Sequence, residues 1–245
     1  MGLPHLISIV GAGPGDPELL TIKALNRLKE ADVILFDALM GEEILEFANP
    51  AAQRKYVGKI YNDGQNQIER QEAINNEILH WASEGKKLVH LKTGDPMVFA
   101  RGAEEIRFCR ANNINFEIIP GITAGLAASS LFSIPLTERG KSNMLLFYTA
   151  NRENGGFYDV EPLIHVIQSG APVVIFMGLN NLPNLATELT KKGIETKTTV
   201  QILSNISKLG QKIWSTNIGE VAEFLMENKP ETPSLIIIGR NVQQI

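Results

Sequence analysis

The sequence predicts an α/β protein built from two domains. Short apolar runs alternate with amphipathic segments along most of the 245 residues, an alternation that is typical of strands joined by helices. Two runs near the C-terminus are separated only by "NISKLG", which indicates an antiparallel hairpin. Pro120 and Gly121 interrupt the chain after a predicted strand. We therefore expect an N-terminal domain over 1–119 with a mainly parallel sheet, and a C-terminal domain over 120–245 with a mixed sheet.

The predicted strands are short apolar or β-branched runs, each bounded by polar or turn-forming residues. In chain order they are Leu6–Val10, Val33–Phe36, Lys55–Val57, Lys87–Leu91, Phe116–Ile119, Met144–Tyr148, Val173–Met177, Thr198–Leu203, Lys212–Ser215 and Leu235–Ile238. Helical patterns lie between many of them.

The clearest predicted helix is "QIERQEAINNEILHWASEG", over 67–85. Its apolar residues Ile74, Ile78 and Trp81 recur at helical spacing and lie on one stripe. Gly85 is the residue expected to end it, because a helix C-terminus favours the left-handed conformation that glycine adopts without strain.

Composition excludes several classes of function. The net charge of −4 disfavours general nucleic-acid binding, which depends on a basic face. No apolar segment approaches the ~20 residues that cross a bilayer, and the N-terminus has no signal-peptide pattern. Cys109 is the only cysteine, which fits the reducing cytoplasm, and we expect it to be buried and inert. The four histidines are scattered, so no metal site is predicted.

The opening stretch "ISIVGAGPGDPELLTIKAL" resembles half of a dinucleotide-binding fingerprint. Gly11 and Gly13 follow a predicted strand, and the acidic Asp37 stands about twenty residues further on. Asp16, however, occupies the place of the third small residue, where its carboxylate repels a diphosphate. A role for Asp16 as a helix cap fits equally well. The glycines then serve close approach of the backbone to a different ligand at the carboxyl ends of the strands.

Five stretches together resemble the S-adenosylmethionine-dependent tetrapyrrole methylases. After the opening loop "VGAGPGDPELLTIKAL" these are "YVGK" (56–59), "LKTGDPMVFARGAEE" (91–105), "IPGITAGLAAS" (119–129) with "IPLTERG" (134–140), and "FMGLNNL" (176–182). They follow one another in register over nearly the whole chain. Within the family, "VGK", "QEAIN", "RGAEE" and "IPLTERG" most resemble the members that methylate uroporphyrinogen III.

The resemblance implies a methyltransferase that uses S-adenosylmethionine and no metal. It implies C-methylation of uroporphyrinogen III at two ring carbons to give precorrin-2, in sirohaem or cobalamin biosynthesis. The alternative is a later precorrin, such as precorrin-4. It also implies an active cleft between the two domains, and a homodimer. A nicotinamide-binding oxidoreductase or a non-catalytic nucleotide-binding module is the rival from another class.

The family pattern also assigns cofactor-binding positions. By resemblance these are Pro14, Thr93, Gly94, Asp95, Val98, Thr123, Ala124, Met177 and Ile206. Several of these residue types also have ordinary structural uses: Gly94, Asp95 and Pro96 are turn formers, Thr123 is a good helix N-cap, and Met177 is a residue type commonly found in cores.

Catalytic roles fall by resemblance on Asp37 and Lys59. Methylation of a pyrrole carbon requires the later loss of a proton, which an acid–base pair near the ring assists. Both side chains are equally compatible with ordinary charged loop residues.

Substrate-binding positions implied by the resemblance are Gly13, Asp16, Arg101 and Arg139. The substrate carries many carboxylates, and arginine pairs with carboxylates through two parallel hydrogen bonds. Arg101 can instead form a local pair with Glu104 or Glu105.

Overall fold

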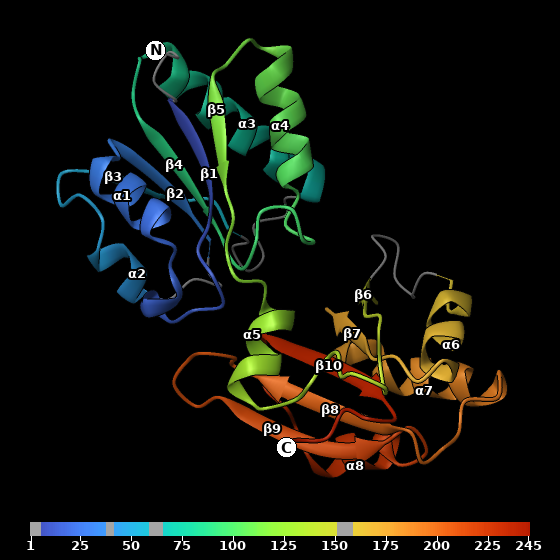
Figure 1. Cartoon of the computed structure of the whole chain (residues 1–245). Coiled ribbons are helices and arrows are strands. Elements are labelled where there is room, and N and C mark those ends of the chain that lie inside the picture. Colours follow the sequence, from blue (N-terminus) through green and yellow to red (C-terminus); the bar gives the residue numbers. More distant parts are fainter. Residues whose placement is uncertain (1–5, 38–41, 59–65, 151–158) are drawn as a thin grey trace. The chain divides into compact units, whose positions relative to one another are not determined.

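The chain folds into two compact units, Met1–Thr123 and Ala124–Ile245, in a computed structural model (Figure 1). The structure describes residues 6–37, 42–58, 66–150 and 159–245. The boundary expected after Ile119 falls in the same connection, which joins the last strand of the first unit to the first helix of the second.

The first unit is built on a five-stranded parallel sheet of order β3-β2-β4-β1-β5. Its strands are β1 (Ile7–Gly11), β2 (Val33–Phe36), β3 (Gln53–Tyr56), β4 (Leu88–Lys92) and β5 (Phe116–Ile119). The central strand β4 is buried along its whole length. Such continuous burial is expected of parallel strands that are covered on both faces.

Helices cover both faces of this sheet (Figure 1). They are the short 3-10 helix η1 (Pro17–Leu19), α1 (Ile22–Glu30), α2 (Glu42–Glu46), α3 (Gln67–Ser83) and α4 (Gly102–Ala111). The α1–α2 side and the α3–α4 side each bury a separate apolar cluster. From β1 the chain continues to β2 and then to β3 at one edge of the sheet. It then returns to β4, between β2 and β1, and ends with β5 at the other edge. Right-handed crossovers therefore place the two pairs of helices on opposite faces.

Helix α3 confirms the helix predicted from 67 to 85. The Asn66 side chain accepts the backbone N–H groups of Ile68 and Glu69, and the Glu69 side chain accepts the N–H of Asn66. This reciprocal capping box satisfies donors that the first turn leaves unpaired. Gly85 follows the helix with φ of 67°, in the left-handed region.

The second unit holds a mixed five-stranded sheet of order β6-β7-β10-β8-β9. Its strands are β6 (Leu146–Thr149), β7 (Val173–Phe176), β8 (Thr199–Ser204), β9 (Lys212–Asn217) and β10 (Ser234–Gly239). Only the β6–β7 pair is parallel. The predicted hairpin is confirmed, since β8 pairs antiparallel with β9 from Thr199 to Ser204.

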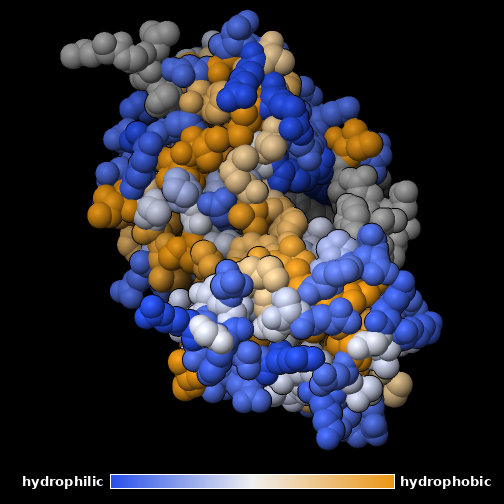
Figure 2. Space-filling view, turned by 45° about the vertical axis from the view of Figure 1, so that its right-hand side comes forward, coloured by the Kyte–Doolittle hydropathy of each residue, from blue (hydrophilic) through white to orange (hydrophobic). Residues whose placement is uncertain are grey.

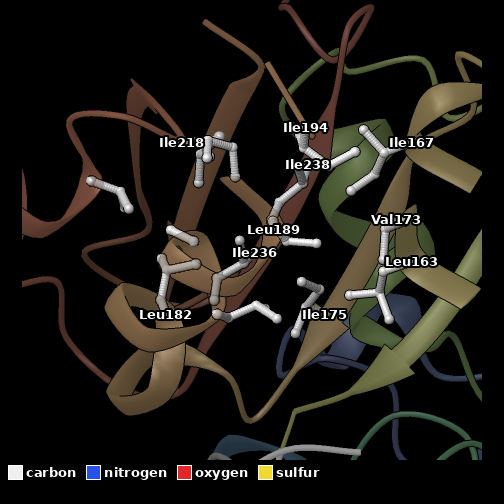
Figure 3. Close-up of a cluster of buried hydrophobic side chains, with 14 of the residues drawn as sticks. Leu163, Ile167, Val173, Ile175, Leu182, Leu189, Ile194, Ile218, Ile236 and Ile238 are labelled. Atoms are coloured by element: carbon white, nitrogen blue, oxygen red, sulfur yellow. The ribbon is translucent and has the colours of Figure 1, made fainter. Parts of the chain in front are cut away.

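The main core of the second unit lies on one face of this sheet. Helices α6 (Glu161–Gln168), α7 (Leu182–Lys191) and α8 (Val221–Glu227) bury their apolar sides there, with the 3-10 helix η2 (Leu179–Asn181) leading into α7. Figure 3 shows how Leu163, Ile167 and Leu189 of the helices meet Ile175 and Ile236 of the strands. Helix α5 (Ala124–Leu131) lies on the opposite face against β7 and β10.

The predicted fold class is confirmed: two α/β units, one with a parallel and one with a mixed sheet. Each predicted strand overlaps an observed one.

Cys109 is fully buried, and burial together with nearby Glu105 raises the pKa of its thiol to about 11. Within the described residues, no helix combines the length and apolarity that crossing a bilayer requires. Figure 2 shows one face of the chain, on which hydrophobic residues reach the surface among hydrophilic ones.

Candidate functional site

The carboxyl ends of the parallel strands bring several predicted residues to one edge of the first sheet. All five strands run in the same direction, so the loops after them meet at this edge. Gly11 ends β1, Asp37 follows β2, and Thr93 follows β4. Pro120 follows β5. Residues far apart in sequence thus meet at one edge of the sheet.

Three of these loops are packed against one another through glycines. A Cβ placed on Gly11 lies 2.4 Å from the Gly121 nitrogen, and one on Gly121 lies 2.2 Å from the Gly94 oxygen. Real Cβ atoms essentially never approach so closely. Gly13 and Gly94 also exchange two backbone hydrogen bonds, of 3.2 and 2.8 Å. The glycines of the opening loop are therefore required by backbone-to-backbone packing.

Asp95 locks the turn after β4 onto the end of β5. Its Oδ1 accepts the Met97 N–H at 2.8 Å, and its Oδ2 accepts the Gly121 N–H at 3.1 Å. The Val98 N–H donates to the Asp95 carbonyl at 3.2 Å. Gly94 has φ of 74°, as the turn requires. The turn predicted for this motif is thus present, and its carboxylate is part of it.

A pocket of about 490 Å³ opens beside this turn, and several charged side chains are among the residues that line it. The lining residues that bear on chemistry are Asp37, Arg70, His90, Lys92, Thr93 and Arg101. The Thr93 hydroxyl donates to Asp37 Oδ1 at 3.3 Å. Three of the predicted site residues, Asp37, Thr93 and Arg101, are therefore brought together within the first unit.

The loop that closes one side of the pocket has an unusual backbone. Phe99 and Arg101 have φ of 53° and 59°, a region that non-glycine residues rarely adopt. A Cβ on Gly102 lies 2.3 Å from the Pro96 oxygen, so glycine is required there. Such strain persists only where the surroundings enforce it, and it is commonest at functional sites.

Arg101 forms the local ion pair that the sequence left open. Its guanidinium donates to both carboxylate oxygens of Glu104, at 2.9 and 2.6 Å. This pairing lowers the pKa of Glu104, against a smaller opposing effect of burial. Arg101 lines the pocket at the same time.

In the opening loop, Asp16 is a helix cap. Its Oδ1 accepts the Glu18 N–H at 2.9 Å at the start of η1. Gly13, with φ of 74°, and Pro14 are buried. The prediction of a capping role for Asp16 is therefore confirmed.

The second unit has its own edge of strand ends. Strands β7 and β8 both pair antiparallel with β10, so their carboxyl ends lie on either side of its beginning. Met177 follows β7 with φ of 55° and is 55% exposed, so the interpretation as a core methionine is wrong. Ile206, after β8, is buried. At the end of β6, the buried Thr149 hydroxyl has no hydrogen-bond partner among the described residues.

The remaining predicted residues that the structure describes belong to both units. Thr123 is buried and Ala124 begins α5. Arg139 lies in a turn of the second unit that the Glu138–Ser142 bridge closes. Lys59 lies outside the described residues. Of the described histidine, cysteine, aspartate and glutamate side chains, no three or more are grouped so as to hold a metal ion.

Sequence reasoning missed His90 and Glu105 as members of the pocket region. The signal was present in β4, where His90 and Lys92 are polar residues two apart in an otherwise apolar strand. Residues two apart share one face of a strand. Glu105 stands beside Ile106 and near Cys109 on the buried side of α4, a place that a carboxylate occupies only when it is paired.

Comparison with known proteins identifies the family. The family model of tetrapyrrole (corrin/porphyrin) methylases matches residues 6–222, which include every predicted site residue. The chain belongs to this family. The tetrapyrrole methylase resemblance drawn from the five motifs is thereby confirmed.

Two curated relatives place the chain within the tetrapyrrole methylases. It is 36% identical to the uroporphyrinogen-III C-methyltransferase of Priestia megaterium, over 96% of this chain and 98% of that protein. It is 38% identical to the siroheme synthase of Psychrobacter arcticus, over 95% of this chain. In that second case it covers only 42% of the relative's length.

A solved tetrapyrrole methylase agrees in fold as well as in sequence. The structure of uroporphyrin-III C-methyl transferase from Thermus thermophilus, complexed with S-adenyl homocysteine, superposes with a TM-score of 0.82. Identity is 35%, and the match covers 96% of this chain and 98% of that one.

Proposed function

We propose that this chain is the methyltransferase that transfers methyl groups from S-adenosylmethionine to two ring carbons of uroporphyrinogen III, giving precorrin-2. The observation that carries the proposal is the full-length relationship to the Priestia megaterium enzyme, which is 36% identical over 98% of its length. The structure of the Thermus thermophilus relative with S-adenyl homocysteine supports the choice of methyl donor.

The described strand edges have features that suit an uncharged adenosyl group better than a phosphate. Met177 offers an exposed thioether side chain, held by a strained backbone, at the end of β7. The buried Thr149 hydroxyl nearby lacks a partner among the described residues, and a ligand that reaches it gains a hydrogen bond. Asp16 already serves as a cap, and its carboxylate opposes a phosphate in the opening loop.

We assign donor binding to the positions implied by the family pattern. They are Pro14, Thr93, Gly94, Asp95, Val98, Thr123, Ala124, Met177 and Ile206. S-adenosylmethionine supplies a methyl group on a positively charged sulfur, and the protein's task is to align that methyl group with the nucleophilic carbon. The rigid glycine junction suits this task, because it fixes the loops after β1, β4 and β5 against one another.

Asp37 is the proposed proton acceptor. When the new carbon–carbon bond forms, the carbon–sulfur bond breaks, and the methylated ring carries a positive charge until a proton leaves. Asp37 lines the pocket and accepts a hydrogen bond from Thr93, which restricts the position of its carboxylate. Lys59 is proposed as the second catalytic group. Gly13, Asp16, Arg101 and Arg139 are proposed to contact the tetrapyrrole.

The function is tested by mass spectrometry after anaerobic incubation with S-adenosylmethionine and uroporphyrinogen III. The expected product carries two added methyl groups. Methylation of precorrin-4 without methylation of uroporphyrinogen III overturns the assigned substrate.

Asp37→Asn is expected to lower kcat by about 10²- to 10⁴-fold, the usual contribution of acid–base catalysis. Its affinity for S-adenosylhomocysteine, measured by calorimetry, is expected to stay unchanged.

We further propose that the protein acts in the cytoplasm as a homodimer. The single buried cysteine agrees with a reducing compartment. Analytical ultracentrifugation of the purified chain is expected to give the mass of two copies of 26.9 kDa. A monomer at micromolar concentration contradicts this part of the proposal.

A further inference from the structure

A buried charged cluster lies in the wall of the pocket. It consists of His90 and Lys92 on β4 and Glu105 on α4, and we call it the Glu105 cluster. Glu105 Oε1 accepts from the Lys92 ammonium at 2.5 Å, and Oε2 lies 3.0 Å from His90 Nδ1. The Glu105 side chain is fully buried, and that of Lys92 is 10% exposed.

The hydrogen-bond geometry defines how each group is oriented. Burial by itself raises the pKa of Glu105, but His90 and Lys92 outweigh it and lower this pKa to about 2. The carboxylate is therefore ionised and can only accept hydrogen bonds. His90 must carry its hydrogen on Nδ1, and Lys92 directs one of its several N–H donors to Glu105. The other donors of that ammonium can serve a second acceptor.

Basic side chains outnumber acidic ones among the described residues that line the pocket beside the cluster, and two of them, Lys92 and Arg101, are each paired with a glutamate that lies outside the lining. His90 and Lys92 line it, together with Arg70 from α3, Arg101 from the loop before α4, and Asp37 after β2. Asp37 is the only acidic side chain among the described residues of the lining. Glu105 is not part of the lining, so it holds Lys92 from behind. This arrangement suits a ligand with carboxylate groups.

A second buried carboxylate in the same unit gives a useful contrast. Glu117 on β5 pairs with Lys23 and Arg27 of α1 and accepts the Ser8 hydroxyl. Burial by itself raises the pKa of Glu117, but these partners, Arg27 foremost, outweigh it and lower the pKa to about 2. Glu117 and its partners do not line the pocket. They attach α1 to the sheet, whereas the Glu105 cluster places the cationic side chain of Lys92 in the pocket wall.

We infer that Lys92 is a substrate-recognition residue that binds a carboxylate side chain of the tetrapyrrole, and that Glu105 is the residue that positions it. The inference rests on the proposed function for the identity of the substrate. A fixed ammonium loses little conformational freedom on binding, which favours the complex. The neighbouring His90 ring is held by the same carboxylate and forms part of the same wall.

The test uses Lys92→Met combined with Glu105→Gln in the full chain. Removing both charges together leaves no unpaired buried ion, so this double variant is expected to fold. The KM for uroporphyrinogen III is expected to rise about 10- to 100-fold, the worth of one hydrogen bond to a charged group. We expect kcat to stay within about threefold, and affinity for S-adenosylhomocysteine within about twofold, because only a substrate contact is lost.

Glu117→Gln is the matched control. It neutralises the other buried carboxylate of the first unit and is expected to lower stability while leaving KM unchanged. An equal rise of KM in this control shows that any loss of buried charge perturbs the site, which overturns the inference.

Two further measurements separate positioning from a structural role. Glu105→Gln alone is expected to raise KM by part of the same factor. The KM of the double variant is expected to equal that of Lys92→Met alone, because Glu105 acts through Lys92.

Fluorescence titration with uroporphyrin III, the oxidised and stable tetrapyrrole, measures binding without turnover. Wild-type affinity of the double variant for uroporphyrin III overturns the inference, whether or not the chain methylates uroporphyrinogen III. Absence of methylation by the wild-type chain overturns the proposed function alone.

Discussion

At the scale of single residues, the glycines of the first unit have two different uses. Gly121 is needed for space, since a Cβ there lies 2.2 Å from the Gly94 oxygen. Gly85 is needed for conformation, since its φ is 67° while nothing lies within 4 Å of an added Cβ. Glycine is thus required by packing at position 121 and by backbone conformation at position 85.

These two glycines predict different responses to alanine. Gly121→Ala is expected to lower the free energy of unfolding by about 3 kcal/mol or more, because the backbone of three loops must shift to admit the methyl group. Gly85→Ala is expected to cost only about 1 kcal/mol, the penalty of a left-handed alanine. Urea denaturation measures both, and calorimetry with S-adenosylhomocysteine checks that only Gly121→Ala weakens binding. Equal costs for the two variants contradict the packing argument.

At this scale, the sequence predicted the structure correctly where a short motif determines its own local geometry. The turn at Gly94 and the cap at Asp16 follow from local chemistry, and both are present. The partner of Arg101 was left open between two adjacent glutamates, because a helix start brings both within reach. The structure selects Glu104, while Glu105 is buried with His90 and Lys92. That choice depends on which face of α4 meets β4, which periodicity in one segment does not give.

At the scale of elements, the prediction was most complete. The strands were found because short apolar runs between turn residues are a strong local signal, and the hairpin of β8 and β9 followed from a short connection. Strand order was not predicted. The sequence does not state that β4 lies between β2 and β1, since that order depends on contacts between segments far apart in the chain.

The attachment of α1 to the sheet predicts a pH dependence. Glu117 joins Lys23 and Arg27 of α1 to Ser8 of β1, and its pKa is lowered from 4.5 to about 2. Because the folded pKa lies below the unfolded one, the stabilisation is fully present above about pH 4.5. It is lost as the pH falls toward 2.

We expect Glu117→Gln to be less stable than the wild type by about 2 kcal/mol at pH 7, a value reduced for the partial exposure of Lys23 and Arg27. The difference is expected to shrink steadily between pH 5 and pH 2. Urea denaturation at several pH values measures it. A difference that stays constant over this range would show that Glu117 stabilises the unit without its charge.

At the scale of the whole molecule, each unit has its own buried core. The clusters under α1–α2 and α3–α4 belong to the first unit, and the cluster under α6, α7 and α8 belongs to the second. The two tryptophans of the chain are divided in the same way, since Trp81 packs in the first unit and Trp214 in the second. Fluorescence can therefore follow each unit separately.

A core substitution in one unit is expected to affect that unit most. Ile236→Ala removes a side chain that is 1% exposed and is expected to destabilise the second unit by about 3 kcal/mol. In a Trp81→Phe background, Trp214 reports the second unit, and its denaturation midpoint is expected to fall. In a Trp214→Phe background, the midpoint reported by Trp81 is expected to move less. Identical shifts from both tryptophans indicate that the chain unfolds as one cooperative body.

The inert thiol of Cys109 makes this chain a convenient host for site-specific dyes. Maleimides react with thiolates, and a fully buried thiol with a pKa of about 11 offers almost none at neutral pH. Cysteines introduced at the exposed positions Ser83 and Leu209, one in each unit, are therefore labelled without removing the native one. Energy transfer between the two dyes then reports directly whether the units change their separation when S-adenosylhomocysteine is added.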